Sequence, residues 1–389
     1  MADRLTAHGL DNLHDAAARH VGPDLVPGVV ALVASGDQVH VETLGTVSVS
    51  GPLVQRDSLF RIASITKPVT GAATLALIEE GLVGLDEPVD TLLPELASRR
   101  VLARPDGPLE DTVPASRPIT TRDLLTFTFG FGMVTEMFLA PKPWPVMTAV
   151  TELRLGAIGP PDPASKPDPD TWMARFGSLP LMAQPGERWM YNTGAHVLGV
   201  LLARAAGQSF ADVLRTRIFE PLGMADTAFW TSQSDRLATA YQATTGGLVV
   251  ADPSDGAWSR PPAFEDGAAG LVSTADDLYA FARMLLTGGA PVLAPQSVAA
   301  MTIDQLTAEQ KARGGLGFDF FDHLSWSYCQ AVQDTGAFGW NGGYGTSWLV
   351  DPSQDLVVIV QTQRLFDSPE GPPLHREIQA AAYAALADS

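Results

Sequence analysis

The chain of 389 residues has 46% hydrophobic and 18% charged residues, which is the composition of a well-packed globular protein and not of a disordered one. This length favours two domains, or one domain with a large insertion. A formal net charge of −19 repels polyanions, so we expect neither nucleic acid nor an acidic membrane surface as a partner.

The N-terminal sequence and the cysteine content indicate the compartment. Residues 1–20 contain no apolar segment followed by a small-residue cleavage site, and no run of about 18 apolar residues occurs, so we predict neither a signal peptide nor a membrane span. The single cysteine, Cys329, cannot form an internal disulfide, which favours a reducing, cytoplasmic location. We expect its side chain to be a buried small hydrophobe rather than a nucleophile.

Hydrophobic periodicity predicts the first elements of the chain. Apolar residues at helical spacing indicate an amphipathic helix over residues 4–20. Two strands follow over residues 28–35 and 38–45, separated by a short turn that favours a hairpin. Residues 66–80 are apolar nearly all round, which predicts a buried helix that ends at Gly81.

The pattern of predicted secondary structure changes in the middle of the chain, from about residue 86. Short helical patterns alternate there with proline and glycine, and the proline-rich stretch 140–170 is incompatible with a long strand. Helices are predicted over residues 196–207 and 210–223, each closed by glycine.

Strand patterns return after about residue 240, together with a helix after Thr274, two strands within 344–363 and a last helix over 370–387. Both chain ends therefore contribute to one layered unit. We predict an α/β domain with an antiparallel sheet from residues 1–85 and 240–389, and an inserted helical domain from residues 86–239. A site is expected in the crevice between the two parts.

Ser64 and Lys67 lie three residues apart in the stretch RIASITKPVTGAATLALIEEG, residues 61–81. Pro68 is tolerated only in a first helical turn, which places the helix start near Thr66. At that position the lysine can reach the serine hydroxyl, and burial favours a neutral lysine that accepts the serine proton. The motif alone is weak, because a serine cap followed by a lysine that extends to solvent gives the same spacing.

Two further segments are candidates for the same site. Tyr191 lies in QPGERWMYNTGAHVLG, residues 184–199, at a turn before a helix, where a phenol can relay a proton. The stretch FGWNGGYGTSWLVDP predicts two strands around Gly342 and Gly343, where the backbone can approach a ligand and supply an oxyanion N–H. A core tyrosine and a glycine bulge explain the same residues without a function, so both interpretations stay open.

These three pieces, in this order and spacing, resemble the serine hydrolase family of class C β-lactamases, penicillin-binding-type D,D-peptidases and family VIII carboxylesterases. The resemblance covers roughly residues 10–385 and includes LFRIASITKPVTGAATLALIEEGLVGLDEPV (59–89) and AAGLVSTADDLYAFARMLL (268–286). It implies a β-lactamase/transpeptidase-like fold of class α/β plus all-α, in which helices flank an antiparallel sheet and a helical domain is inserted.

The resemblance implies catalytic roles for three residues. Ser64 would be the acylated nucleophile, Lys67 its base or base partner, and Tyr191 the tyrosine of the Y-x-N motif. Which of Lys67 and Tyr191 takes the proton depends on their coupled pKa values. The sequence departs from the motif in its third residue, which is Thr193, with Asn192 one place early, so recognition of an amide by that asparagine is not expected to carry over.

The resemblance also implies binding roles around the glycine pair. Trp340, Asn341 and Gly342 occupy the place of the K-T-G, H-T-G or W-G-G variants, and the N–H groups of Gly343 and Ser64 would form the oxyanion hole. The motif lysine, whose charge would bind a carboxylate, is replaced by Trp340. An indole cannot replace that charge but can pack against an apolar acyl or alcohol group.

The sequence therefore predicts a cytoplasmic serine hydrolase that cleaves a carboxylic ester through an acyl-enzyme on Ser64, with Lys67 as the only lysine in the cleft. Hydrolysis of β-lactams, amides or oligoamides, or acyl transfer to an alcohol, at the same site is the alternative. A third possibility is a non-catalytic, penicillin-binding-like sensor. The expected partner is a small-molecule ester or amide.

No motif predicts a metal or a cofactor. The seven histidines show no metal-ligand spacing, and neither a G-x-S-x-G elbow nor a dinucleotide glycine fingerprint is present. Five aromatic side chains either line an apolar pocket or pack in the core: Phe129, Phe131, Trp189, Tyr344 and Trp348.

Overall fold

The computed structural model describes residues 4–156, 159–317, 319–368 and 371–387. Within these residues, seven antiparallel strands form the main sheet in the order β2-β1-β13-β12-β11-β10-β9. The strands are β1 (Gly28–Ser35), β2 (Gln38–Gly45), β9 (Leu324–Trp326), β10 (Ala331–Gln333), β11 (Phe338–Gly342), β12 (Thr346–Asp351) and β13 (Leu356–Thr362). The predicted fold class is confirmed.

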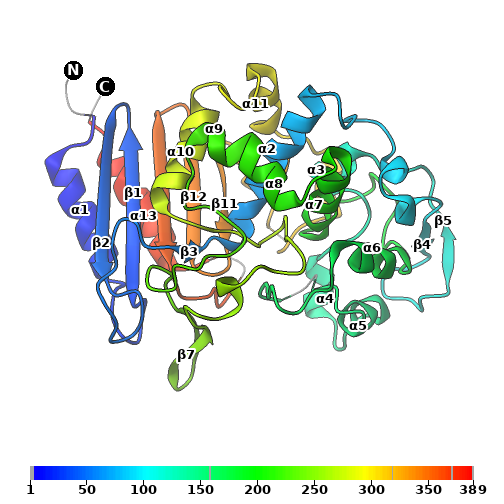
Figure 1. The fold of residues 1–389 in the computed structure, drawn as a ribbon, viewed down its shortest axis with the longest axis horizontal. Helices are drawn as coiled ribbons and strands as arrows, with labels where there is room; N and C mark the ends of the chain where they lie inside the picture. Colours follow the sequence, from blue (N-terminus) through cyan, green and yellow to red (C-terminus); the bar gives the residue numbers. More distant parts are fainter. Residues whose placement is uncertain (1–3, 157–158, 318, 369–370, 388–389) are drawn as a thin grey trace.

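The two ends of the chain meet in this sheet, as the sequence predicts. Strand β1 pairs with β13 from Val29 opposite Thr362 to Ser35 opposite Leu356. Helices α1 (Ala7–Ala18) and α13 (Pro373–Ala384) pack together beside it (Figure 1). Residue 370, where the last helix is predicted to begin, lies outside the described residues.

Strand β1 is buried on both faces, and its alternating side chains enter two different cores. Val29, Ala31 and Val33 join the cluster beneath α1 and α13. Val30 and Leu32 face the opposite core, which continues into the helical part of the molecule. This alternation is the period of two of a strand, so one run of β-branched and small residues serves both layers.

The helices on the other side of the sheet surround α2 (Thr66–Glu79), which begins at the predicted residue and is buried along nearly its whole length. Helix α10 (Ala275–Leu286) covers the sheet, and Thr274 caps it as predicted by accepting the N–H of Asp277. The remaining helices are α3 (Thr121–Leu125), α4 (Thr135–Leu139), α5 (Pro145–Glu152), α6 (Pro169–Gly177), α7 (Thr193–Ala206), α8 (Phe210–Leu214), α9 (Glu220–Leu222), α11 (Pro295–Met301) and α12 (Ala308–Ala312).

Three small strand pairs accompany these helices. They are β3 (Phe60–Arg61) with β8 (Val272–Ser273), β4 (Arg100–Leu102) with β5 (Thr112–Pro114), and β6 (Ala240–Thr244) with β7 (Gly247–Asp252). The helix predicted over 210–223 is interrupted by a π-helical turn at Arg215–Phe219. One hydrophobic cluster joins the sheet to the helices, so the division of the chain at residues 86 and 240 stays a prediction.

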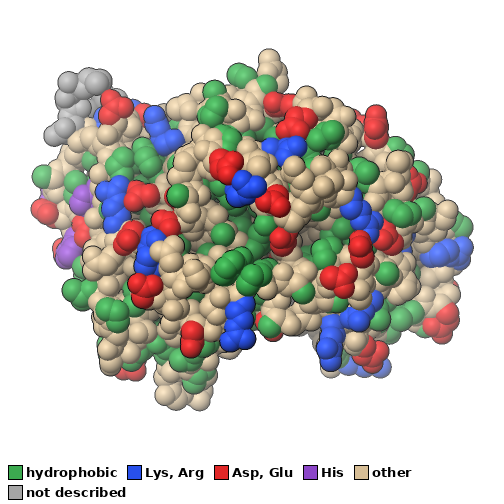
Figure 2. Space-filling model, viewed as in Figure 1, with side chains coloured by type: hydrophobic (Ala, Val, Ile, Leu, Met, Phe, Trp, Pro, Cys, Tyr) green, Lys and Arg blue, Asp and Glu red, His purple; other side chains and the backbone are tan. Residues whose placement is uncertain are grey.

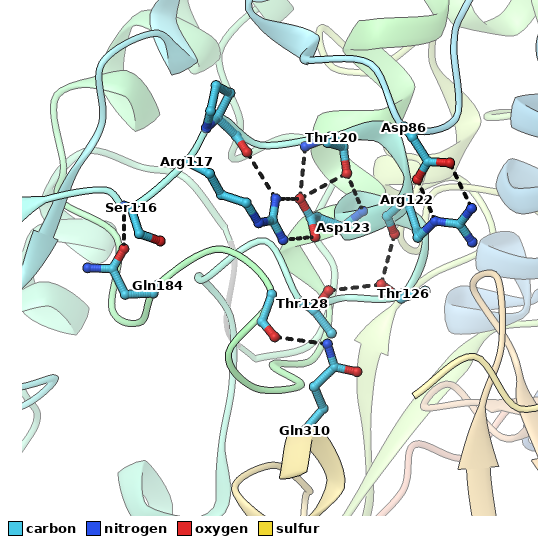
Figure 3. Close-up of polar contacts among 12 residues, drawn as sticks. Asp86, Ser116, Arg117, Thr120, Arg122, Asp123, Thr126, Thr128, Gln184 and Gln310 are labelled. Carbon is cyan, nitrogen blue, oxygen red and sulfur yellow. Dashed lines mark hydrogen bonds and ion pairs between the residues drawn. The ribbon is translucent and has the colours of Figure 1, made fainter. Parts of the chain in front are cut away.

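A polar network holds α3 against its surroundings (Figure 3). Thr120 and Asp123 form a reciprocal capping box at its start. Arg117 donates to both carboxylate oxygens of Asp123, at 2.6 and 2.7 Å. Arg122 pairs with Asp86 at the surface and also donates to the hydroxyl of Tyr328, at 2.7 Å. These bonds secure α3 where it packs on α7.

Acidic and basic side chains are interspersed over the face shown in Figure 2. Across the described part of the chain, no single helix is long and apolar enough to cross a membrane. The consecutive segments Thr193–Ala206 and Phe210–Leu222 meet the length and composition criteria only as a pair, and they are bent by 80° relative to one another.

Candidate active site

Ser64 lies in a single 3₁₀ turn, Ala63–Ile65, between β3 and α2. Ala63 has a φ of 44°, a left-handed conformation that L-residues adopt at a cost. The strand before this turn is held firmly, because Arg61 is buried and its Nε donates to Asp252 Oδ2 at 2.8 Å. The strained turn therefore has a rigid support and leaves Ser64 half-buried at the mouth of α2.

Lys67 is in the first turn of α2 and is 0% exposed. Its Nζ lies 2.9 Å from Ser64 Oγ and 2.8 Å from the carbonyl oxygen of Ala268. Burial lowers the pKa of Lys67 to about 7, against the smaller opposing influence of Asp266. A large fraction of this amine is therefore uncharged at neutral pH, and it is in contact with a serine hydroxyl.

Tyr191 stands over the same lysine, with Lys67 Nζ 4.6 Å from the centre of its ring. Two hydrogen bonds with Met133, each of 2.9 Å, hold its backbone, and Asn192, with a φ of 85°, turns the chain into α7. Burial raises the pKa of Tyr191 to about 12, although hydrogen bonds with Ser64 and Trp340 oppose this effect. The phenol therefore keeps its proton at neutral pH.

Trp340, on β11, donates its indole Nε1–H to the hydroxyl oxygen of Tyr191 at 2.7 Å. Trp326 packs against its ring at a centroid distance of 4.8 Å and an angle of 89°. An indole N–H can only donate, so the Tyr191 oxygen is the acceptor and its own proton is left for Ser64. The motif tryptophan is thus in contact with the phenol, in addition to any contact with a substrate.

The glycine pair after Trp340 brings β11 close to Ser64. A Cβ on Gly342 would lie 2.2 Å from the carbonyl oxygen of Ile62, so only glycine fits there. Gly343 has open space around it, and its carbonyl accepts the N–H of Phe366 at 2.9 Å. Asn341 is half-buried on β11.

A cavity of about 220 Å³ lies in front of Ser64, Tyr191 and Gly343. Its lining is largely apolar and comprises Ala63, Met133, Gly156, Gly159, Pro160, Pro161, Ala269, Tyr344, Leu365 and Phe366, with Asn192, His196, Gln242 and Asp266 as further polar residues. Of the four motif residues predicted to bind substrate or form the oxyanion hole, Gly343 lines this cavity, and Trp340, Asn341 and Gly342 are not part of its lining.

Other predicted side chains are placed as follows. Of the five aromatic residues, Tyr344 lines the cavity, and Phe129, Phe131, Trp189 and Trp348 are buried in the core. Thr193, the third residue of the tyrosine motif, is buried outside the cavity lining. Cys329 is a buried free thiol, as predicted, and burial raises its pKa. The described residues contain no group of three or more His, Cys, Asp or Glu placed to hold a metal ion.

Two polar residues beside the cavity, Asp266 and Lys166, were missed from the sequence, and His196, expected only to pack within its helix, also lines the cavity. Asp266 lines the cavity, and its carboxylate lies 2.9 Å from Lys166 Nζ and 3.3 Å from His196 Nε2. Lys166 is therefore a second buried lysine next to the site, where the sequence predicts Lys67 alone. The available signal was weak: Lys166 is one of only four lysines, and it sits in a proline-rich stretch that predicts little else.

Comparisons with known proteins agree with this geometry. The model of the Beta-lactamase family matches residues 15–383. The chain is 35% identical over 364 residues to a Mycobacterium tuberculosis protein named Rv1367c, which covers 88% of this chain and 87% of that protein. It is 31% identical over 398 residues to the esterase EstB of Burkholderia gladioli, which covers 96% and 94%.

A solved structure described as EstCE1, a hydrolase with promiscuous acyltransferase activity, shares the fold with a TM-score of 0.80. The superposition covers 96% of this chain and 98% of that one, at 24% sequence identity. The family match spans nearly the whole chain, and Ser64 and Lys67 are in hydrogen-bond contact. The chain therefore belongs to the Beta-lactamase family and is a serine hydrolase.

Proposed function

We propose that this protein is a serine esterase that acts through an acyl-enzyme on Ser64. The observation that carries the proposal is the 2.9 Å contact between Ser64 Oγ and the Nζ of Lys67, whose pKa is lowered to about 7 by burial. In the first step Ser64 Oγ attacks the ester carbonyl carbon and its proton passes to Lys67. The negative charge that develops on the carbonyl oxygen is accepted by the N–H groups of Ser64 and Gly343.

Tyr191 donates its proton in the second step. With a pKa of about 12 the phenol keeps its proton at neutral pH, so it donates that proton to the leaving alkoxide rather than accepting one from Ser64, and Lys67 then returns a proton to the phenolate. This assignment gives the base role to Lys67, which the sequence left open. Water repeats the sequence of steps in reverse to release the acid and regenerate Ser64.

The lining of the cavity favours a neutral ester over a β-lactam or a peptide. A carboxylate-bearing substrate needs a cation, and the described lining residues include the carboxylate of Asp266 but neither lysine nor arginine. Trp340 replaces the motif lysine and donates to Tyr191. The relative EstB is named an esterase, which supports the same choice.

The test compares substrates on the same preparation. We expect p-nitrophenyl butyrate to be hydrolysed with a kcat/KM at least about 100-fold above that for nitrocefin, because the missing cation costs about 2.7 kcal/mol of transition-state binding. A p-nitrophenyl alkylphosphonate is expected to label Ser64 once per chain, by intact mass and peptide mapping, and to abolish turnover. Faster turnover of nitrocefin would favour a β-lactamase, and ester turnover that survives complete labelling would contradict the proposal. A stable acyl adduct at Ser64 without turnover would favour the sensor.

Trp340→Phe is expected to lower kcat for p-nitrophenyl butyrate by roughly tenfold with little change in KM. The phenyl ring keeps the packing on Trp326 but removes the N–H that fixes Tyr191, a loss of about 1 to 1.5 kcal/mol. Steady-state kinetics measure kcat and KM, and a thermal melt shows whether the variant is folded. Trp230→Phe, at a partly exposed surface tryptophan, is the matched control. Unchanged kcat in a folded Trp340→Phe would remove the tryptophan from the mechanism.

The cytoplasmic location expected from the sequence belongs to this proposal. Its support is the acidic composition, a net charge of −19 that favours solubility, and the buried free thiol of Cys329. Fractionation of the native cells, with ester turnover and an antibody to the chain as readouts, is the test. Recovery of the protein in the exported fraction would contradict it.

A further inference from the structure

A buried ion pair borders the cavity, because one of its two residues, Asp266, lines it. The side chains of Lys166 and Asp266 are 2% and 6% exposed, and Nζ and Oδ2 are 2.9 Å apart. Taking two charges out of water costs several kcal/mol per ion, so such a pair is weak support for stability. Its position beside a perturbed lysine favours a functional reason for it.

Asp266 is linked to the base by one short turn of backbone. Its Oδ1 accepts the N–H of Ala268 at 2.8 Å. The carbonyl oxygen of the same Ala268 accepts from Lys67 Nζ at 2.8 Å. Thr70, on α2, donates to the carbonyl oxygen of Gly267 at 2.7 Å, which completes the connection between this turn and the helix that carries Lys67.

Lys166 reaches Asp266 from the segment that forms one wall of the cavity. Pro160 and Pro161 of that segment line the cavity, and the carbonyl oxygen of Pro161 accepts from the hydroxyl of Tyr344 at 3.0 Å. The Lys166 stem covers Gly156 so closely that a Cβ there would lie 2.8 Å from Lys166 Cε. The wall is thus fixed at two points, one beside the Gly343 turn and one at Asp266.

The charges around Lys67 come from several elements. Burial alone would raise the pKa of Asp266, but the ion pair with Lys166 and the hydrogen bond with His196 hold it well below its usual range, so Asp266 is a carboxylate. Burial lowers the pKa of His196, which is therefore neutral. The other titratable neighbours of Lys67, Tyr191 and Cys329, keep their protons because burial raises both pKa values.

Asp266 and Lys166 are thus the two ionised groups close to Lys67, and they act in opposite directions. The carboxylate raises the pKa of Lys67 and the second ammonium lowers it. We propose that Lys166 is a positioning residue that neutralises Asp266 and so keeps Lys67 in the uncharged form that acts as the base. This inference rests on the proposed function of Lys67.

The test is the pH dependence of kcat/KM in Lys166→Met. Removing the ammonium leaves the Asp266 carboxylate unopposed, which favours protonated Lys67, so the acid limb of the profile is expected to move up by about one pH unit. At pH 6 this corresponds to a loss of about tenfold relative to wild type, and at pH 9 the two enzymes converge. Lys166→Arg keeps the charge and is expected to retain the wild-type profile. The exposed Lys142 supplies the matched control, Lys142→Met.

A second readout does not depend on ester turnover. The chain has only four lysines, so protein labelled with ¹³C at lysine Cε gives four signals, and Lys67→Met identifies the one from Lys67. We expect that signal to titrate at higher pH in Lys166→Met than in wild type. Asp266→Asn is expected to move the titration and the acid limb to lower pH, and the double variant Lys166→Met/Asp266→Asn to return both towards wild type.

The outcomes distinguish the positioning role of Lys166 from the proposed esterase function. An unshifted Lys67 signal together with an unshifted acid limb in folded Lys166→Met would overturn the positioning role. Full turnover in Ser64→Ala would overturn the proposed function, while the Lys67 titration still reports on Lys166. If Lys166→Met does not fold, the downward shift in Asp266→Asn decides, and its absence counts against the inference.

Discussion

Ser64→Ala is expected to lower kcat for p-nitrophenyl butyrate by about 10⁴-fold or more, leaving only the turnover that binding and the oxyanion donors provide. The alanine keeps the 3₁₀ turn, and the half-buried position of Ser64 tolerates loss of one oxygen. Lys67 Nζ then loses its partner at 2.9 Å, but it keeps the carbonyl of Ala268. The fold should therefore survive while the nucleophile is gone.

The measurement is steady-state turnover together with phosphonate labelling followed by intact mass. Ser232→Ala, which removes an exposed serine on the surface, is the matched control and should behave as wild type in both assays. Ester turnover in Ser64→Ala within tenfold of wild type would show that another group forms the acyl-enzyme. A labelled Ser64→Ala protein would show the same directly.

Local patterns in the sequence were enough to predict the elements that carry the site. The start of α2 follows from Pro68, which fits only a first turn, and the hairpin β1–β2 follows from alternation around a short turn. Both predictions depend on residues that are close together in the sequence. The first of them also predicts that Ser64 and Lys67 lie together at the N-terminus of α2.

The contacts that tune the site could not be predicted in the same way. Lys166 and Asp266 are 100 positions apart, and Trp340 and Tyr191 are 149 apart. No propensity or periodicity brings such residues together, because their separation is set by how the cavity wall and β11 pack on α2 and α7. From the sequence we therefore predict a single lysine in the cleft, and for Trp340 we predict only a contact with substrate.

The proposed assignment of Lys67 as the base also depends on the folded structure. From the sequence, the base stays open between Lys67 and Tyr191, because the choice depends on their coupled pKa values. Burial separates them: it lowers the pKa of the lysine to about 7 and raises that of the phenol to about 12. One environment thus produces a neutral amine and a neutral phenol, which are the forms that a base and a proton donor need at neutral pH.

Lys67→Met is expected to lower kcat/KM by about 10³-fold at pH 8, because no other neutral amine contacts Ser64 Oγ among the described residues. In wild type, activity should rise as pH increases through about 7, where Lys67 loses its proton. In Lys67→Met the pH profile should lack this acid limb, and the remaining kcat/KM should rise only slowly with hydroxide concentration. Lys311→Met, at a partly exposed lysine that pairs with Asp304 away from Ser64, is the control.

In Lys67→Met we expect thermal stability to stay the same or rise, although activity falls. The pKa of Lys67 is lowered in the folded state, so the unfolded chain binds more protons between about pH 7 and the ordinary lysine pKa. Folding is therefore opposed by this group at neutral pH, and stability grows as pH rises through that window. Methionine fills the same volume without the charge, and the lost bond to Ala268 offsets part of the gain. A thermal midpoint at or above that of wild type, together with the loss of turnover, would separate a catalytic role from a structural one, whereas a parallel loss of both would indicate that Lys67 mainly holds the fold.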